Sequence, residues 1–257
     1  MRYRDFFPEI YQPAEILQTF GRPCKNALGE RFSVVIWNMY KGRRPNWQED
    51  FKRLIEGKDL VLLQESVINT RFDPMFSETE YHEWVMARSH RNLKTLAATG
   101  IKTGSSAASI QSNFYISPDV EPIFKTPKMM LATKYALEGG RGELLVVNIH
   151  AINFVSMEKY KRQIVQIVEA ASSHNGPVIL AGDFNTWNAP RYRFLMETAQ
   201  ALGLQEAGLT RKGRISHLNR HLDHIFYRGL ELAGAGVATD IRTSDHYPLT
   251  AEFIVPA

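Results

Sequence analysis

The sequence predicts an α/β fold in which two β-sheets pack against each other and helices cover their outer faces. Segments typical of strands outnumber segments typical of helices by about three to one. Helical segments occur in two parts of the chain, each between strands, and hairpin-like strands fill the middle. Sheets of this kind bury one face against each other and the other beneath helices, which favours a single layered domain.

Residues 1–30 are predicted to form an irregular arm, because prolines and glycines recur through them. We expect a short helix around 14–19 and otherwise no regular structure, although the arm could cover the edge of a sheet. Residues 31–257 then form the predicted domain.

The elements of the domain follow from the spacing of apolar residues. Apolar, β-branched and aromatic runs predict strands over 32–37, 59–63, 82–87, 94–98, 107–112, 120–125, 130–137, 143–149, 178–181, 222–227 and 248–255. Apolar residues at helical spacing predict helices over 46–57, 156–172 and 190–202. Asn46 and Pro190 are typical first residues of helices, and Gly57 is typical of a helix end.

The composition indicates a globular protein with few special constraints. In 257 residues, 44% are hydrophobic and 23% are charged, as in soluble domains. The single cysteine, Cys24, excludes an internal disulfide framework and a zinc site with several thiolates. The net charge of +4 mildly favours polyanionic partners. No apolar run approaches the roughly 20 residues of a membrane span, and the N-terminus does not resemble a signal peptide, so we expect a cytoplasmic protein.

Polar residues gather where the predicted strands end. Asp183 and Asn185 follow the buried run 178–181 and lie two residues apart, so in an extended chain they point the same way. A carboxylate beside an amide can hold a water and a phosphate oxygen. Other strand ends or flanking turns carry further polar residues, namely Asn38, Glu65, Asn148, His150, Asp223, Asp245 and His246.

Each of these residues alone has an ordinary structural explanation. An asparagine such as Asn38 usually caps a turn, Glu65 is typical of a solvated loop, and His150 is typical of a hydrogen-bonded structural histidine. Their joint occurrence at the ends of strands is the observation that favours a site, because sites in α/β structures form at the carboxyl ends of strands.

The order of these motifs resembles the endonuclease/exonuclease/phosphatase superfamily over about residues 32–255. The motifs are Trp-Asn at 37–38, Gln-Glu at 64–65, Asn-x-His at 148–150, Gly-Asp-Phe-Asn at 182–185, Leu-Asp-His-Ile-Phe at 222–226 and Ser-Asp-His at 244–246. The superfamily includes DNase I-like nucleases, abasic-site endonucleases, neutral sphingomyelinases and inositol polyphosphate 5-phosphatases. The chain looks most like a small uncharacterised bacterial branch of it.

The resemblance implies a DNase I-like, four-layered α-β-β-α sandwich with two mostly antiparallel or mixed sheets. It also implies hydrolysis of phosphodiester bonds with Mg²⁺ or Mn²⁺, a hard cation that takes carboxylate oxygens and phosphate oxygens. The implied metal-binding residues are Glu65, Asn38 and Asp245. The implied catalytic residues are Asp183, Asn185, His246, Asp223 and His150. The implied substrate-binding residues are Asn148, Asn185 and Lys41.

Within this scheme Asp183 orients or deprotonates the attacking water, and Asn185 holds the phosphate. Asp223 fixes the tautomer of His246, as in other His–Asp dyads. His150 contacts the phosphate or assists the leaving group. Whether Asp183 or His246 is the general base stays open, as does the choice between one metal ion and two.

The chain departs from many nucleases of the superfamily just after Asn38. Those nucleases carry an aspartate two residues after the equivalent asparagine, whereas this chain has Tyr40 followed by Lys41. This departure weakens the match to abasic-site endonucleases. Lys41 is either a contact for a substrate phosphate or a solvated loop lysine.

Nucleic acid is the first substrate that the sequence suggests, because the basic loops 41–44 and 211–220 could flank a groove. A phospholipid, sphingomyelin or inositol phosphate is the alternative, which exposed apolar residues beside the site would favour. A catalytically silent binding module on the same fold is the non-enzymatic alternative. The oligomeric state stays open.

Overall fold

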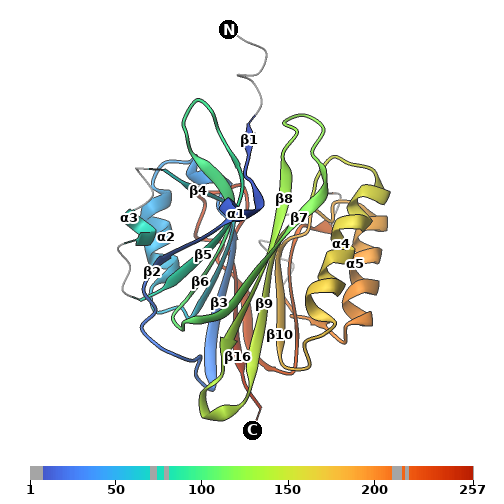
Figure 1. Cartoon of the computed structure of the whole chain (residues 1–257). Coiled ribbons are helices and arrows are strands. Elements are labelled where there is room, and N and C mark those ends of the chain that lie inside the picture. Colours follow the sequence, from blue (N-terminus) through green and yellow to red (C-terminus); the bar gives the residue numbers. More distant parts are fainter. Residues whose placement is uncertain (1–7, 70–73, 78–80, 210–215, 218–219, 257) are drawn as a thin grey trace.

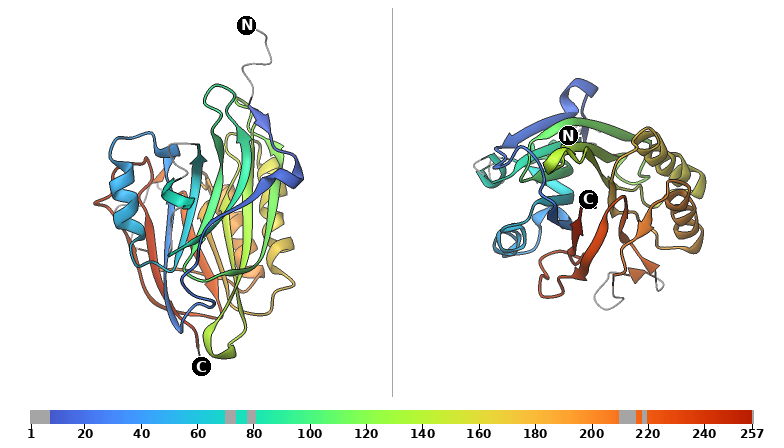
Figure 2. Two further views of the ribbon diagram at one scale, coloured as in Figure 1. Left: turned by 60° about the vertical axis from the view of Figure 1, so that its left-hand side comes forward. Right: turned by 90° about the horizontal axis from the view of Figure 1, so that it is seen from below.

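The computed structural model describes residues 8–69, 74–77, 81–209, 216–217 and 220–256. Two β-sheets stand face to face, with helices on the outer side of each (Figure 1). The view from below separates the layers, with α2 (Trp47–Ile55) outside one sheet and α4 (Met157–Ala171) and α5 (Ala189–Ala201) outside the other (Figure 2). The predicted α/β sandwich is therefore confirmed.

The first sheet has eight strands and carries the N- and C-terminal parts of the chain. Its strand order is β1-β5-β6-β4-β3-β16-β15, with β2 also paired to β5. β3 and β4 are parallel and the other pairs are antiparallel. The strands are β1 (Glu9–Ile10), β2 (Leu17–Gly21), β3 (Arg31–Asn38), β4 (Leu60–Ile68), β5 (Glu83–Arg91), β6 (Ala98–Ser105), β15 (Glu231–Val237) and β16 (Leu249–Ile254).

The second sheet has six strands in the order β11-β14-β10-β9-β8-β7. β9 and β10 are parallel, and the other pairs are antiparallel. The strands are β7 (Ser109–Val120), β8 (Pro127–Ala136), β9 (Glu143–His150), β10 (Val178–Asp183), β11 (Gln205–Glu206) and β14 (Asp223–Arg228). The described chain also contains a two-stranded ribbon of β12 (Ser216–His217) and β13 (Arg220–His221), the short helices α1 (Pro13–Ile16) and α3 (Pro74–Ser77), and the 3₁₀ turns η2 (Tyr40–Gly42) and η3 (Glu138–Gly140).

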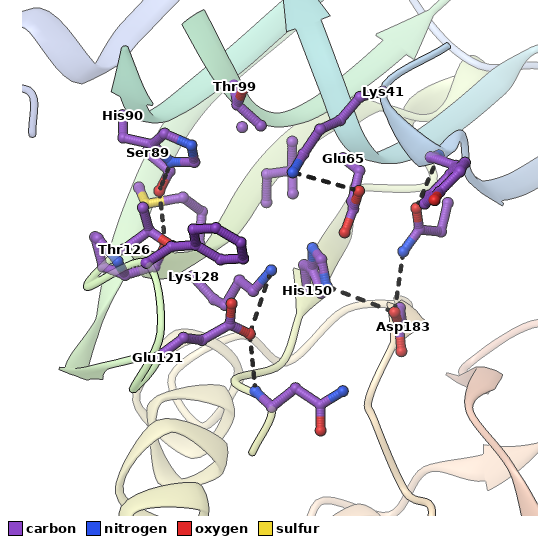
Figure 3. Close-up of a pocket in the computed structure, with 18 of the residues that line it drawn as sticks. Lys41, Glu65, Ser89, His90, Thr99, Glu121, Thr126, Lys128, His150 and Asp183 are labelled. Carbon is purple, nitrogen blue, oxygen red and sulfur yellow. Dashed lines mark hydrogen bonds and ion pairs between the residues drawn. The ribbon is translucent and has the colours of Figure 1, made fainter. Parts of the chain in front are cut away.

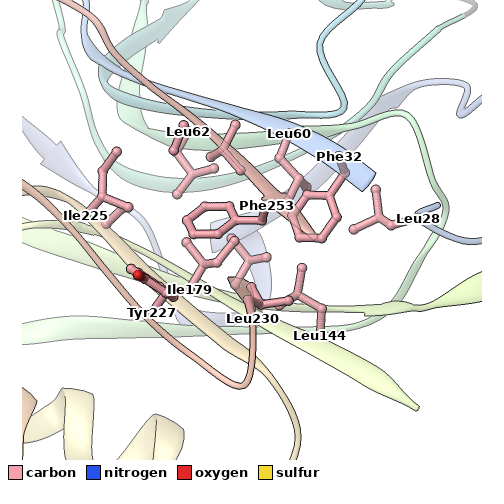
Figure 4. Close-up of a cluster of buried hydrophobic side chains, with 14 of the residues drawn as sticks. Leu28, Phe32, Leu60, Leu62, Leu144, Ile179, Ile225, Tyr227, Leu230 and Phe253 are labelled. Carbon is pink, nitrogen blue, oxygen red and sulfur yellow. The ribbon is translucent and has the colours of Figure 1, made fainter. Parts of the chain in front are cut away.

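The alternation of side chains along the strands builds the layers. In β3, Val34 and Ile36 join the cluster between the sheets, while Val35 and Trp37 pack outward against α2. The inter-sheet cluster combines Phe32 and Leu60 of the first sheet with residues such as Ile179 of the second (Figure 4). On the far side, α4 and α5 cover the second sheet. Burial on both faces explains why the central strands are almost continuously apolar.

The N-terminal arm is more regular than expected. β1 and β2 both pair with β5, and α1 separates them. The short helix expected around 14–19 is present as α1, one turn long. The expectation of an otherwise irregular arm is wrong for β1 and β2, because backbone hydrogen bonds to an open strand supply the order that the sequence pattern lacks. The expectation that this segment covers a sheet edge is confirmed.

Two predicted strands are turns instead. Residues 92–97 connect β5 to β6, and residues 121–126 connect β7 to β8. Leu96 and Lys125 have φ values of 55° and 53°, which end the extended conformation. Apolar residues in these turns imitate a strand in the sequence. Conversely, the strand β15 was not predicted, because its alanines and glycines have low strand propensity.

One glycine in the predicted site motif has a clear steric reason. Gly182 has a φ of 142°, and a Cβ atom there would lie 2.0 Å from the carbonyl oxygen of Ile149. Only glycine lets β10 approach β9 this closely, directly before Asp183. No helix in the described part of the chain is long and apolar enough to cross a membrane.

Candidate active site

The predicted site residues come from both sheets and meet at one edge of the sandwich. Asn38 ends β3, His150 ends β9, and Asp183 ends β10. Asp183 is directly opposite His150 on one side and Asp223 on the other, so three functional side chains share one rung of the second sheet. Parallel strands bring their carboxyl ends to the same edge, which is why residues far apart in sequence converge.

A cleft of about 670 Å³ opens at this edge. Figure 3 shows His150 and Asp183 at its inner end, Lys41 and Glu65 on one wall, and Glu121 and Lys128 on another. Every predicted site residue except Asn148 and Asp223 lines the cleft, namely Asn38, Lys41, Glu65, His150, Asp183, Asn185, Asp245 and His246. Asp223 lies behind His246.

Asp183 contacts several other predicted site residues at the inner end of the cleft. It is 2% exposed, and its Oδ2 atom accepts a hydrogen bond from Nδ2 of Asn38 at 3.0 Å. The same atom lies 3.5 Å from Nε2 of His150 and 3.9 Å from Nε2 of His246, while Oδ1 accepts from the backbone N–H of Asn185 at 3.0 Å. Burial raises the pKa of Asp183 to about 7, against the opposing charge of His246. A carboxyl poised near neutrality can accept a proton.

His246 is held as a dyad with Asp223. Its Nδ1 atom lies 2.7 Å from Oδ2 of Asp223, and its backbone carbonyl accepts a hydrogen bond from the indole N–H of Trp37 at 3.1 Å. Burial lowers the pKa of His246, but attraction and hydrogen bonding by Asp223, with the charge of Asp183, outweigh it and raise this pKa to about 10. With its pKa raised in this way, His246 is predominantly protonated at neutral pH, and its Nε2 atom lies 3.9 Å from Oδ2 of Asp183.

His150 differs from His246 in its charge, because its environment favours the neutral imidazole. Burial lowers the pKa of His150 well below 6.5, and the positive charges of Lys128, His246 and Lys41 reinforce this. The second histidine is therefore neutral in the same cleft. Gln163 accepts from the backbone N–H of Ile152 and donates to the carbonyl of His150, which fixes the chain just beyond β9.

Glu65 reaches the cleft because β4 is bulged. Leu60 and Leu62 face the inter-sheet core and Leu63 faces outward, so regular alternation would aim Glu65 outward as well. The register to β6 shifts between Leu63 and Ser66, and Glu65 has a φ of 48°. The bulge turns the Glu65 carboxylate into the cleft, where Nζ of Lys41 lies 3.8 Å away.

Asn185 and Asn38 are both held by backbone contacts. Asn185 has a φ of 50° and donates from Nδ2 to the carbonyl of Ala151 at 2.8 Å. Oδ1 of Asn38 accepts from the backbone N–H of Tyr40 at 3.1 Å. Both side chains are oriented in advance, which suits residues that contact a substrate or metal.

Asn148 does not reach the cleft. It is fully buried, and its Oδ1 accepts from Nε2 of Gln64 at 2.7 Å, while its Nδ2 donates to the carbonyl of Lys102 at 2.8 Å. Asn148 shares a face of β9 with His150 but lies one step deeper between the sheets. The predicted substrate contact is thus corrected to a role in joining the two sheets directly behind the site.

The donor set suits a hard divalent cation. Glu65, Asp245 and Asn38 offer oxygen atoms to the cleft, and Mg²⁺ and Mn²⁺ prefer oxygen ligands. A second candidate cluster in the described chain combines Asp183, Asp223 and His246, whose ligand atoms lie within 4.8 Å of one another. Because Asp223 and His246 are hydrogen-bonded to each other at 2.7 Å, this cluster offers a cation fewer free ligand atoms than the oxygen atoms on the Glu65 side do.

Several supporting residues could not be found from the motifs. Lys128 and Glu121 line the cleft from the β7–β8 hairpin and pair with each other at 3.4 Å. Arg191 is 1% exposed and donates to the carbonyls of Ile152, Asn185 and Val155, so it fastens two cleft loops to α5. An arginine near a helix start carries no sequence signal for such a role. Of the predicted basic loop 211–220, residues 211–215 and 218–219 lie outside the described residues, and the others belong to β12 and β13.

The model of the Endonuclease/Exonuclease/phosphatase family matches residues 35–246, and the chain belongs to this family. It is 37% identical over 229 residues to a "UPF0294 protein" of Klebsiella pneumoniae (strain 342), covering 87% of this chain and 82% of that protein. This relationship agrees with the expected bacterial branch.

Solved structures share the fold at low sequence identity. An endonuclease/exonuclease/phosphatase from Beutenbergia cavernae superposes with a TM-score of 0.69 at 16% identity, over 88% of this chain and 72% of that chain. The catalytic domain of human Nocturnin superposes with a TM-score of 0.66 at 16% identity, over 90% of this chain and 99% of that chain.

Proposed function

We propose that this protein is a divalent-metal-dependent hydrolase that cleaves phosphodiester bonds by in-line attack of water. The observation that carries the proposal is the setting of Asp183, a buried carboxylate whose Oδ2 atom lies 3.5 Å from Nε2 of His150 and 3.9 Å from Nε2 of His246 at the inner end of an open cleft. Hydrolysis of a diester needs a proton acceptor for the water and a cation for the phosphoryl charge, and this arrangement offers both.

The charge states suggest which residue is the base. His246 already carries a proton up to about pH 10, so it cannot take one from water at neutral pH. Ionised Asp183 accepts the proton of the attacking water as the new O–P bond forms and the bond to the leaving oxygen breaks. The Nε2–H of His246 donates a hydrogen bond to a phosphoryl oxygen, and Asp223 keeps the imidazolium oriented.

The remaining side chains position the substrate and the ion. Asn38 holds Asp183 by its Nδ2–H, and Asn185 offers its amide to the phosphate. Glu65, Asp245 and Asn38 would hold the divalent ion. When bound, the ion supplies polarisation of a phosphoryl oxygen and neutralises the leaving alkoxide.

Two substrate classes have support from specific features. Nucleic acid, the expectation from the sequence, is favoured by the cations Lys41, Arg43 and Lys128 that line the cleft. A phospholipid is favoured by the exposed apolar side chains Leu93, Phe124 and Phe154, which line the outer part of the same cleft.

The test is a substrate panel with Mg²⁺ or Mn²⁺. The panel contains plasmid, single-stranded DNA, RNA, bis-p-nitrophenyl phosphate, sphingomyelin and inositol phosphates. We expect metal-dependent turnover by the wild type that is lost in Asp183→Ala and His246→Ala. Asp240→Ala is the matched control, because Asp240 is an exposed carboxylate paired with Arg53 away from the cleft.

Two results would contradict the proposal. If no substrate is turned over with either metal, the binding-module alternative replaces the enzyme. If turnover survives in both site variants, the reaction occurs elsewhere on the protein.

A further inference from the structure

Exposed apolar side chains gather at the mouth of the cleft. In the described chain, the four most exposed large apolar residues all lie in three connections beside it, while the next, Ile110 and Val165, are 53% exposed. The four are Leu96, Ile123 and Phe154, each 69% exposed, and Phe124, which is 66% exposed. We call the connections 92–97, 121–126 and 153–155 the docking rim. The first two project at the same end of the molecule (Figures 1 and 2), and residues of all three line the one cleft.

Two of these exposed side chains are attached to backbone in the left-handed conformation. Leu96 and Phe154 have φ values of 55° and 54°, a region that bulky residues rarely adopt. Neither side chain gains burial within the chain in return. Strain of this kind at an exposed apolar residue points to a use outside the fold.

The rim is tied together rather than loose. Oε1 of Glu121 accepts from the backbone N–H of Asn153 at 3.1 Å, which links the β7–β8 turn to the connection that carries Phe154. Oδ1 of Asn153 in turn accepts from the backbone N–H of Phe154 and from the indole N–H of Trp187, both at 2.9 Å. The β7–β8 turn and the connection that carries Phe154 therefore share one hydrogen-bonded frame.

The charge of the rim is positive. Lys94 shares a turn with Leu96, and Lys125 follows Phe124, and both lysines are exposed. The one carboxylate in the three connections is Glu121, whose charge is offset by Lys128 at 3.4 Å. Apolar tips flanked by lysines complement a surface that is apolar within and negatively charged outside.

We propose that the docking rim binds the surface of an anionic phospholipid bilayer and so brings lipid head-group phosphates to the mouth of the cleft. The proposal rests on the proposed function only in its second part, the delivery of a phosphodiester. The aliphatic Leu96 and Ile123 favour lipid over single-stranded nucleic acid, because bases stack on aromatic side chains and gain little from aliphatic ones.

The test is co-sedimentation of the full chain with vesicles in EDTA, so that binding is measured without turnover. We expect binding to vesicles of phosphatidylcholine mixed with phosphatidylglycerol, weaker binding to phosphatidylcholine alone, and partial release by salt. The double variant Lys94→Gln/Lys125→Gln should weaken binding about 25-fold, since each lysine near an anionic surface contributes about fivefold.

The apolar contribution is tested by Leu96→Asn/Ile123→Asn. Asparagine tolerates the left-handed conformation at position 96, so the fold should be retained, which circular dichroism and thermal melting check. Binding should weaken on the order of tenfold. The matched control is Ile110→Asn, an exposed isoleucine at the opposite end of β7, which should bind like the wild type.

The outcomes separate the two proposals. Failure of the wild type to sediment with the anionic vesicles overturns the docking rim, as does an equal loss of binding in Ile110→Asn. Binding of a single-stranded oligonucleotide instead of vesicles replaces the bilayer with nucleic acid. Turnover of soluble bis-p-nitrophenyl phosphate, measured separately with Mn²⁺, tests the proposed function whatever the vesicles show.

Discussion

At the inner end of the cleft, Asp183 is 2% exposed and both of its carboxylate oxygens accept hydrogen bonds, whereas at the rim Leu96 and Phe154 are each 69% exposed. The inner end of the cleft is built from strand ends of the two sheets. The rim is built from the connections between consecutive strands and helices. Strand ends are fixed by hydrogen-bonded registers, and turns can change without disturbing a core. If both proposals hold, the sheets set the chemistry and the turns set the partner.

The largest effect should come from Asp183→Asn. Asparagine keeps the shape of the side chain but cannot accept a proton from water, so we expect kcat to fall by about 10³-fold. Steady-state kinetics on a soluble diester measure it, with Asp240→Asn as the control. A decrease in substrate affinity alone would mean that Asp183 binds rather than activates.

Next in size is Asp223→Asn, with an expected loss of about 10²-fold in kcat, measured by steady-state kinetics on the same soluble diester.

The same variant should change the titration of His246. In the wild type the pKa of His246 is raised, so its protonation stabilises the fold fully below pH 6.5, and this contribution is lost as the pH rises through about 10. Without the Asp223 charge, burial should dominate and lower the pKa of His246. Titration of the imidazole by NMR in metal-free protein measures the shift, and an unchanged midpoint would refute the dyad.

Asn148→Ala tests the buried hydrogen bonds that join the two sheets behind the inner end of the cleft. The variant leaves Gln64 and the Lys102 carbonyl without their buried partner, so the free energy of unfolding should fall by about 1–3 kcal/mol. Chemical denaturation measures this. If stability is unchanged while KM rises, Asn148 contacts the substrate after all.

A smaller effect is expected for Lys41→Ala, on the wall between the two regions. Removing the ammonium 3.8 Å from Glu65 should tighten binding of Mn²⁺ about threefold and raise KM for a diester by a similar factor. Isothermal titration and kinetics report the two changes separately. An unchanged KM would remove Lys41 from the substrate site.

The smallest effect should come from Leu96→Asn alone. Since asparagine adopts the left-handed conformation readily, the free energy of unfolding should stay the same or rise by about 0.5 kcal/mol. Thermal melting measures it, with Ile110→Asn as the reference. A clear loss of stability would show that Leu96 serves the fold and would weaken the contrast between the regions.

The sequence predicted the inner end better than the rim for a physical reason. Strand ends such as Asp183 follow buried apolar runs whose periodicity is visible in the sequence. Asn148 was misassigned because β9 is buried on both faces, and periodicity cannot tell a residue at the cleft from one a step deeper. The turns were mistaken for strands because their apolar residues serve no core.

His150, Asp183 and Asp223 lie on one rung of the second sheet, and this has a consequence for how the protein can vary. The two hairpin turns at 92–97 and 121–126 lie outside that rung, so insertions there change no distance within it. Loops of different length cost little to close. The turns can therefore vary in length without moving the three strand ends, provided that position 121 keeps its hydrogen bond to the backbone of Asn153.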